Sequence, residues 1–311
     1  MAYHDLRDWI AQLDRAGELR RIREEIDPIL EIAEITDRAS KAGRKSGLQG
    51  YAPGGPALLF ERVKGHPGAS VLMNQFGSRR RMEMALETSS LDEIAGRIQA
   101  LMEMKSPEGM LGKLKMLPTL AEVGKFFPKV VPSRQALCKQ VIHRDNFSVL
   151  DFPVLQCWPM DGGRFITLPL VVTRDPLHGK RNMGMYRMQV YDGQTTGMHW
   201  QRQKVAAEHF RERLRMAAAS SATGSAVAAR MEIMASTAGG STRVAGTVAG
   251  VPALTTTDLR GERMEVAVAI GTDPATTFSA IVPAPPEVEE YIIAGFLRQA
   301  PVELVQCETV D

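Results

Sequence analysis

The first hundred residues alternate between two hydrophobic periods. Leu6, Trp9, Ile10 and Leu13 recur at helical spacing, and Gly17 stands where a C-terminal cap belongs. The pattern predicts, in order, a strand at 19–26, a helix at 31–42, strands at 57–63 and 70–73, and helices at 82–86 and 91–104. Alternating strands and helices are typical of an α/β domain, which we expect at residues 1–105.

The pattern changes twice further along the chain. Residues 106–159 are broken into short pieces by six prolines, which disfavour helices and interior strands and predict a wrapping connector. From Phe165 the runs ITLPLVVTRDP, NMGMYRMQVYDG and QTTGMHWQ read as strands separated by Asp-Pro and Asp-Gly turns. RMEVAVAIG and TTFSAIVPAP predict two more extended runs, followed by a helix at 286–298 and a strand at 302–307.

Residues 160–311 are therefore expected to form a second, β-rich domain. Within it, residues 215–259 consist mainly of Ala, Ser, Thr and Gly and contain no aromatic side chain. Because such a segment has few large side chains to bury, we expect a mobile or loosely packed insertion there, partly helical where alanine dominates.

Composition narrows the class of protein. The chain is 44% hydrophobic and 24% charged, with a net charge of +2, so no strong field implies nucleic acid or an anionic membrane as a partner. The N-terminal residues are charged throughout and show no apolar signal core. Three widely spaced cysteines suggest neither a disulfide framework nor a CxxC metal site, and we expect a cytoplasmic protein.

The candidate chemistry centres on two neighbouring predicted strands. The sequence contains no GxxxxGK[ST], GxSxG or HExxH motif, and no GxGxxG between a strand and a helix. A short turn at Gly193 lets the strands carrying Asn182 and His199 pair antiparallel. An amide oxygen and an imidazole, joined by a carboxylate, suit a divalent cation such as Mn²⁺. Alternatively, Asn182 begins a turn and His199 packs on Trp200.

A family resemblance rests on these residues. The string RNMGMYRMQVYDGQTTGMHWQRQ resembles the central motif of the UbiD family of prenylated-FMN-dependent decarboxylases. Four further stretches agree with that family in order: HDLRDWIAQLDRAGELRRI, FPVLQCWPMDGGRFITLPLVVTRDP, RMEVAVAIGTDPATTFSAIVPAP and EYIIAGFLRQAPVELVQCETVD. The resemblance implies an α+β protein whose N-terminal α/β domain precedes a split β-barrel flavin-binding domain.

The resemblance also implies roles for individual residues. Asn182, His199 and Glu290 match the ligands of a divalent metal that bridges the flavin phosphate, with Glu289 as the alternative to Glu290. Arg187 is implied as the catalytic residue that meets substrate or flavin; otherwise it is a surface arginine at a strand edge. Taken alone, Glu290 also reads as a solvated carboxylate on a helix face. The remaining residues implied to line the cofactor are Met185, Tyr186, Arg187, His199, Trp200, Gln201 and Lys204.

The implied activity is the reversible, non-oxidative decarboxylation of an aromatic or α,β-unsaturated carboxylic acid. The implied cofactors are prenylated FMN and Mn²⁺ or another divalent cation, and K⁺ is a further candidate. The implied partners are the acid substrate and a flavin prenyltransferase that supplies the cofactor, and the full-length members of the family are implied to be homo-oligomers. On this resemblance the chain ends before the family's acidic motif and C-terminal domain, so we expect little turnover by residues 1–311 alone. The alternatives are a non-catalytic prenylated-FMN and metal-binding module and, less favoured, a flavin reductase.

Overall fold

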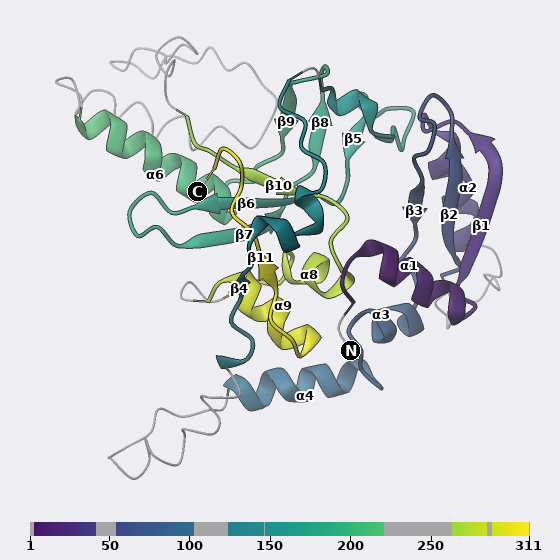
Figure 1. The fold of residues 1–311 in the computed structure, drawn as a ribbon, viewed down its shortest axis with the longest axis horizontal. Helices are drawn as coiled ribbons and strands as arrows, with labels where there is room; N and C mark the ends of the chain where they lie inside the picture. Colours follow the sequence, from purple (N-terminus) through teal and green to yellow (C-terminus); the bar gives the residue numbers. More distant parts are fainter. Residues whose placement is uncertain are drawn as a thin grey trace, which may run out of the picture.

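The N-terminal unit is a small three-layered α/β arrangement. The computed structural model describes residues 3–41, 54–102, 124–145, 147–220, 263–284 and 288–310 (Figure 1). The elements of the N-terminal unit are α1 (Leu6–Arg15), β1 (Leu19–Ile26), α2 (Glu31–Lys41), β2 (Ala57–Val63), β3 (Val71–Met73), α3 (Arg79–Ala85) and α4 (Leu91–Met102). Their order confirms the elements predicted from the sequence, with ends that differ by a few residues.

The sheet of this unit has the order β1-β2-β3, with β1 and β2 parallel and β3 antiparallel to β2. A parallel pair requires a crossover, and α2 is that connection. Ile32 of α2 packs with Leu58 and Phe60 of β2 in one buried cluster. Trp9 and Leu13 of α1 pack against Ala57 and Ala85 in another, so the apolar stripe of α1 is buried as its spacing predicts.

The described part of the connector consists of short pieces. These are β4 (Lys129–Val130) and the 3₁₀ turns Ser133–Gln135, Leu137–Lys139 and Val149–Asp151. β4 pairs in parallel with β11 (Glu303–Leu304), so this segment lies beside the last strand of the chain. Lys139 and Arg144 both form ion pairs with Glu308 and reinforce that contact.

Two small antiparallel sheets form the β-rich part. One has the order β10-β6-β7, from β10 (Ala267–Ala269), β6 (Leu170–Arg174) and β7 (Arg181–Met185). The other has the order β5-β8-β9, from β5 (Phe165–Ile166), β8 (Met188–Val190) and β9 (Thr196–Met198). The described strands do not close into a barrel, so the split-barrel arrangement stays a prediction.

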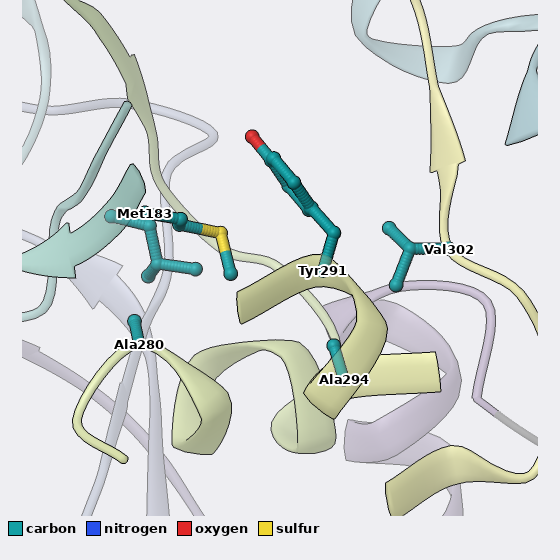
Figure 2. Close-up of a cluster of buried hydrophobic side chains, with 6 residues drawn as sticks. Met183, Ala280, Tyr291, Ala294 and Val302 are labelled. Atoms are coloured by element: carbon teal, nitrogen blue, oxygen red, sulfur yellow. The ribbon is translucent and has the colours of Figure 1, made fainter. Parts of the chain in front are cut away.

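Helices cover both faces of the β10-β6-β7 sheet. Ala206 of α6 (Val205–Ser220) packs with Val171 and Tyr186 on one face. On the other face, Leu170 and Met183 pack against α9 (Glu290–Arg298), the residues after α8 (Pro274–Ser279), and Val302. Figure 2 shows Met183 beside Ala280, with Tyr291 and Ala294 of α9 and Val302 completing this cluster.

One run of this part that the sequence predicts to be extended is partly helical. The run 276–285 was predicted to be extended, but residues 274–279 form α8. This prediction was wrong because the Asp273 side chain accepts a hydrogen bond from Thr276 N and Pro274 occupies the first turn, both of which start a helix. Residues 215–220 belong to α6, whereas the rest of the predicted insertion lies outside the described residues.

The N-terminal unit packs against α8 and α9. Leu86, after α3, and Ile94 of α4 form a buried cluster with Ala275 and Leu297. The next residue of α9, Arg298, donates a hydrogen bond to the carbonyl of Tyr3. Along the described residues, no helix is both long and apolar enough to cross a membrane.

Candidate functional site

The candidate site is built around the free edge of β7. β6 occupies the other side of β7, so alternate β7 amides point away from the sheet. Met183 N donates to Glu290 Oε2 at 2.9 Å, and Met185 N donates to the Ala280 carbonyl at 3.2 Å. Arg181 N donates to Glu289 Oε1 at 3.4 Å. The start of α9 therefore satisfies the strand edge with two consecutive glutamates.

Two buried polar residues, Glu290 and Asn182, belong to this part of α9 and β7. Both residues are less than a tenth exposed, and Asn182 precedes the residue whose amide Glu290 accepts. Burial raises the pKa of the Glu290 carboxyl, while the Met183 amide opposes that rise. Asn182 Nδ2 has no hydrogen-bond partner within the described part of the chain. No described Lys, Arg or His forms an ion pair with Glu290. The site therefore offers carboxylate and amide oxygens as possible metal ligands, and no cationic side chain offsets the charge of Glu290.

Glu289 has a different environment. Its carboxylate pairs with the Arg181 guanidinium, Nη2 to Oε2, at 2.9 Å. Its side chain is about a quarter exposed, whereas Glu290 is buried. The two candidates that sequence reasoning left open are thus distinguished by charge: Glu289 is neutralised by Arg181, and Glu290 is not.

A second polar group lies under α6, on the face of the sheet that carries Asn182. Thr173 is directly opposite Asn182 in the β6–β7 register, and its hydroxyl lies 2.9 Å from His209 Nδ1. Burial lowers the pKa of His209. The Tyr186 hydroxyl accepts a hydrogen bond from Ala206 N at 3.2 Å, and the Tyr186 ring crosses Gly184 so closely that a Cβ there would lie 2.5 Å from it.

Burial raises the pKa of the Tyr186 hydroxyl, whereas the hydrogen bond from Ala206 N and the nearby Asn182 side chain oppose the rise. The hydroxyl therefore stays protonated in the neutral pH range and adjoins the Asn182 amide. Tyr186 is only 3% exposed, so it supports the site from beneath α6.

Arg187 occupies the short link between β7 and β8. Its Nη2 lies 3.0 Å from Asp161 Oδ2, its Nη1 lies 3.4 Å from Asp161 Oδ1, and its guanidinium lies 3.7 Å from the centre of the Phe165 ring. Arg187 also hydrogen-bonds Cys157 and lowers the pKa of Asp161. The guanidinium is thus held in a fork geometry by a carboxylate, with more than a third of the side chain still exposed.

The residues predicted from the His199 region lie between β9 and α6. The His199 side chain is exposed, and its backbone N donates to the Arg187 carbonyl at 3.0 Å. The Trp200 ring packs on Phe210 at 5.5 Å, while Gln201 is exposed. Lys204 is half-buried and precedes the first turn of α6, where its carbonyl accepts from Glu208 N.

The structure therefore places the Glu290 carboxylate on the amide that follows Asn182, and it joins His199 to Arg187 through a backbone hydrogen bond. Asn182 lies on β7, whereas the strand that pairs with β9 is β8, so Asn182 lies on one sheet and His199 follows the last strand of the other. In the described part of the chain, no three His, Cys, Asp or Glu side chains gather as a metal cluster. His199 as a third ligand stays a prediction.

Sequence reasoning missed the partners of the site residues. Asp161 lies within the quoted run WPMDGGRF, but nothing local links it to Arg187. Arg181 directly precedes Asn182, and its role depends on Glu289, 108 residues away. The only signal in the sequence for Asp161 and Arg181 was their position inside long motifs that resemble the family.

Comparisons with known proteins identify the family. A model described as the 3-octaprenyl-4-hydroxybenzoate carboxy-lyase Rift-related domain matches residues 129–241 and 229–311, and the N-terminal domain model of the same carboxy-lyase matches residues 10–98. The chain belongs to the UbiD family.

Relatives place the chain further. An uncharacterised protein of Archaeoglobus fulgidus is 42% identical over all 311 residues, which span 52% of that relative. Two structures of the UbiD-class enzyme HmfF from Pelotomaculum thermopropionicum are similar in fold over 99% of this chain. The one in complex with prFMN has a TM-score of 0.69, 25% identity and 54% of its chain covered. The one in complex with FMN has values of 0.66, 27% and 52%. The chain thus spans about half the length of these relatives.

Proposed function

We propose that this chain supplies the cofactor-binding and metal-binding part of a prenylated-FMN-dependent decarboxylase, built on a split β-barrel. The proposed reaction is the non-oxidative decarboxylation of an aromatic or α,β-unsaturated carboxylic acid. The observation that carries the proposal is the buried Glu290 carboxylate, which accepts from the amide that follows Asn182 and has no ion-pair partner among the described residues, in a chain of the UbiD family.

The donor set fits a hard divalent cation. Carboxylate and amide oxygens are the ligands that Mn²⁺ and Mg²⁺ prefer, and a cation would offset the unfavourable burial that raises the Glu290 pKa. Asn182 and Glu290 would hold the ion, with His199 as the proposed third ligand. A flavin phosphate near residues 199–204 and the first turn of α6 would benefit from the positive end of that helix and from Lys204.

Arg187 has the geometry to orient an acid substrate. A guanidinium donates through two parallel N–H groups to a carboxylate, as Arg187 already does to Asp161. The rest of its N–H groups lie on a partly exposed side chain and are available to a second carboxylate. Prenylated FMN, when bound, supplies the electron sink that the loss of CO₂ requires. The residues of the chain bind the acid, position it and hold the cation.

Ligand binding tests this proposal. We expect the purified chain to retain prFMN or FMN in a Mn²⁺-dependent manner, followed by flavin fluorescence, and Glu290→Gln to weaken that retention strongly. Glu212→Gln, in an exposed ion pair on α6, is the matched control and should behave as the wild type. Flavin retention that ignores Mn²⁺, or that survives Glu290→Gln unchanged, would contradict the metal assignment.

A binding module without turnover is the second candidate. It is favoured by the Arg187 guanidinium, whose two N–H groups are already engaged by Asp161. The two candidates differ in one measurement, CO₂ release from aromatic and acrylic-type acids by the chain loaded with prFMN and Mn²⁺. Release above background supports the decarboxylase, and flavin retention with no release supports the binding module.

A further inference from the structure

We propose that the Arg181–Glu289 ion pair is a positioning device that sets which of two adjacent carboxylates accepts the Met183 amide, next to Asn182 in β7. The inference rests on the proposed metal site. Arg181 contacts Glu289 through three groups: its backbone N, its Nε at 3.4 Å and its Nη2 at 2.9 Å. Such a multidentate contact fixes both the distance and the direction of the glutamate side chain.

Arg181 contacts the residues on both sides of Glu290 at the start of α9. Its guanidinium pairs with Glu289 and also lies 5.5 Å from the centre of the Tyr291 ring. Tyr291 is itself buried in the cluster between α9 and β7 shown in Figure 2. The residue between these two anchors is Glu290, so the anchors determine the direction in which its side chain leaves the helix.

The geometry of the two elements makes this register necessary. Outward amides of a strand recur every second residue, about 6.6–6.8 Å apart, whereas consecutive residues of a helix point about 100° apart. Glu289 is extended at the helix N-cap and Glu290 is the first helical residue, so their side chains reach the separate amides of Arg181 and Met183. A shift of one residue would bring Glu289 to Met183 and turn Glu290 away from the edge.

The charges agree with this division. The Arg181 guanidinium neutralises Glu289, which leaves the buried Glu290 carboxylate as the group available to a cation at Asn182. Glu289 and Arg181 are therefore positioning residues that act through Glu290, and neither needs to touch the metal.

The test combines a metal-free and a metal-dependent measurement on Arg181→Met and the milder Glu289→Gln. In protein labelled with ¹⁵N-methionine, hydrogen exchange of the Met183 amide should become faster in both variants. The Met185 amide, which donates to the Ala280 carbonyl on the same edge, is the internal control and should keep its rate. Arg181→Lys should restore part of the Met183 protection.

Mn²⁺ affinity, measured by the electron paramagnetic resonance of the free ion, should fall by roughly 10- to 100-fold in both variants, the usual effect of losing a partner that orients a ligand. Glu290→Gln should lose more. The inference is overturned if the Met183 amide exchanges at the wild-type rate in both variants. It is also overturned if that amide exchanges faster while the Mn²⁺ affinity stays unchanged. If the wild-type chain binds no Mn²⁺, the proposed metal site fails, and the Met183 exchange rates by themselves still decide whether Arg181 and Glu289 position Glu290.

Discussion

At the scale of single residues, Arg187 shows how neighbouring side chains fix the orientation of a guanidinium. The Phe165 ring covers one face of the Arg187 guanidinium, and the Asp161 carboxylate forms an ion pair with its Nη2. Asp161 is itself anchored, because its carboxylate accepts from the Trp158 amide at 3.2 Å. The Arg187 guanidinium is therefore held in one orientation by its neighbours within the chain.

Cys157 reports the charge at this position. Burial raises the pKa of the Cys157 thiol, Arg187 lowers it and Asp161 raises it. Asp161→Asn removes a negative charge, so we expect the Cys157 pKa to fall and its alkylation by iodoacetamide at a fixed alkaline pH to become faster. Arg187→Gln removes the positive charge, so the pKa should rise and alkylation slow.

Peptide mass spectrometry across a pH series separates Cys157 from Cys138 and Cys307. Those two cysteines are exposed and serve as internal controls whose rates should not change. Opposite signs in the two variants are the expected result. Equal acceleration in both would mean that each substitution merely loosens the fold around Cys157.

At the scale of elements, Asp273 determines where the chain changes from strand to helix. It caps α8 through Thr276 N and also pairs with Arg298 at the end of α9, Nη1 to Oδ2, at 3.1 Å. The pair is largely buried, and Arg298 continues to the Tyr3 carbonyl. One carboxylate thus links α8, α9 and the N-terminal segment.

Asp273→Asn keeps an oxygen for the cap but removes the charge. We expect it to lower the free energy of unfolding by about 1–3 kcal/mol, because a buried guanidinium loses a charged partner. Asp273→Ala should cost about 1 kcal/mol more, since the cap is lost as well. Urea unfolding measures both variants, and equal stability of the two would show that the cap contributes nothing.

At the scale of the whole molecule, the N-terminal unit and the β-rich part share a buried interface. Leu86 and Ile94 from one side meet Ala275 and Leu297 from the other. The boundaries predicted at residues 105 and 160 therefore mark changes in the sequence pattern. The parts on either side of them pack against each other through this interface. We propose that the two parts unfold as one cooperative unit.

Leu297→Ala tests this packing. Leu297 is 2% exposed, and its truncation should cost roughly 2–5 kcal/mol through lost burial and a residual cavity. Unfolding followed by tryptophan fluorescence and by circular dichroism should give one shared transition at a lower urea concentration. Leu137→Ala, at a 52% exposed position, should change stability by less than about 0.5 kcal/mol. Separate transitions for the two signals would refute the shared unit.

Much of the N-terminal fold was predictable because its information is local. The helical spacing of Trp9 and Leu13 and the apolar run of β2 each reveal which side of an element is buried. The residue types of the site were also readable: the motif beginning at Asn182 and the helix beginning at Glu290 both stood out by family resemblance.

The partners of those residues were not readable from sequence. That β7 and β8 join different sheets and that Glu289 pairs with Arg181 both depend on contacts made elsewhere in the chain. Periodicity tells which face of an element is buried, because a single element determines its own faces. It does not tell which carboxylate reaches Met183 from 107 residues away, because that choice depends on how a helix seats against a strand edge.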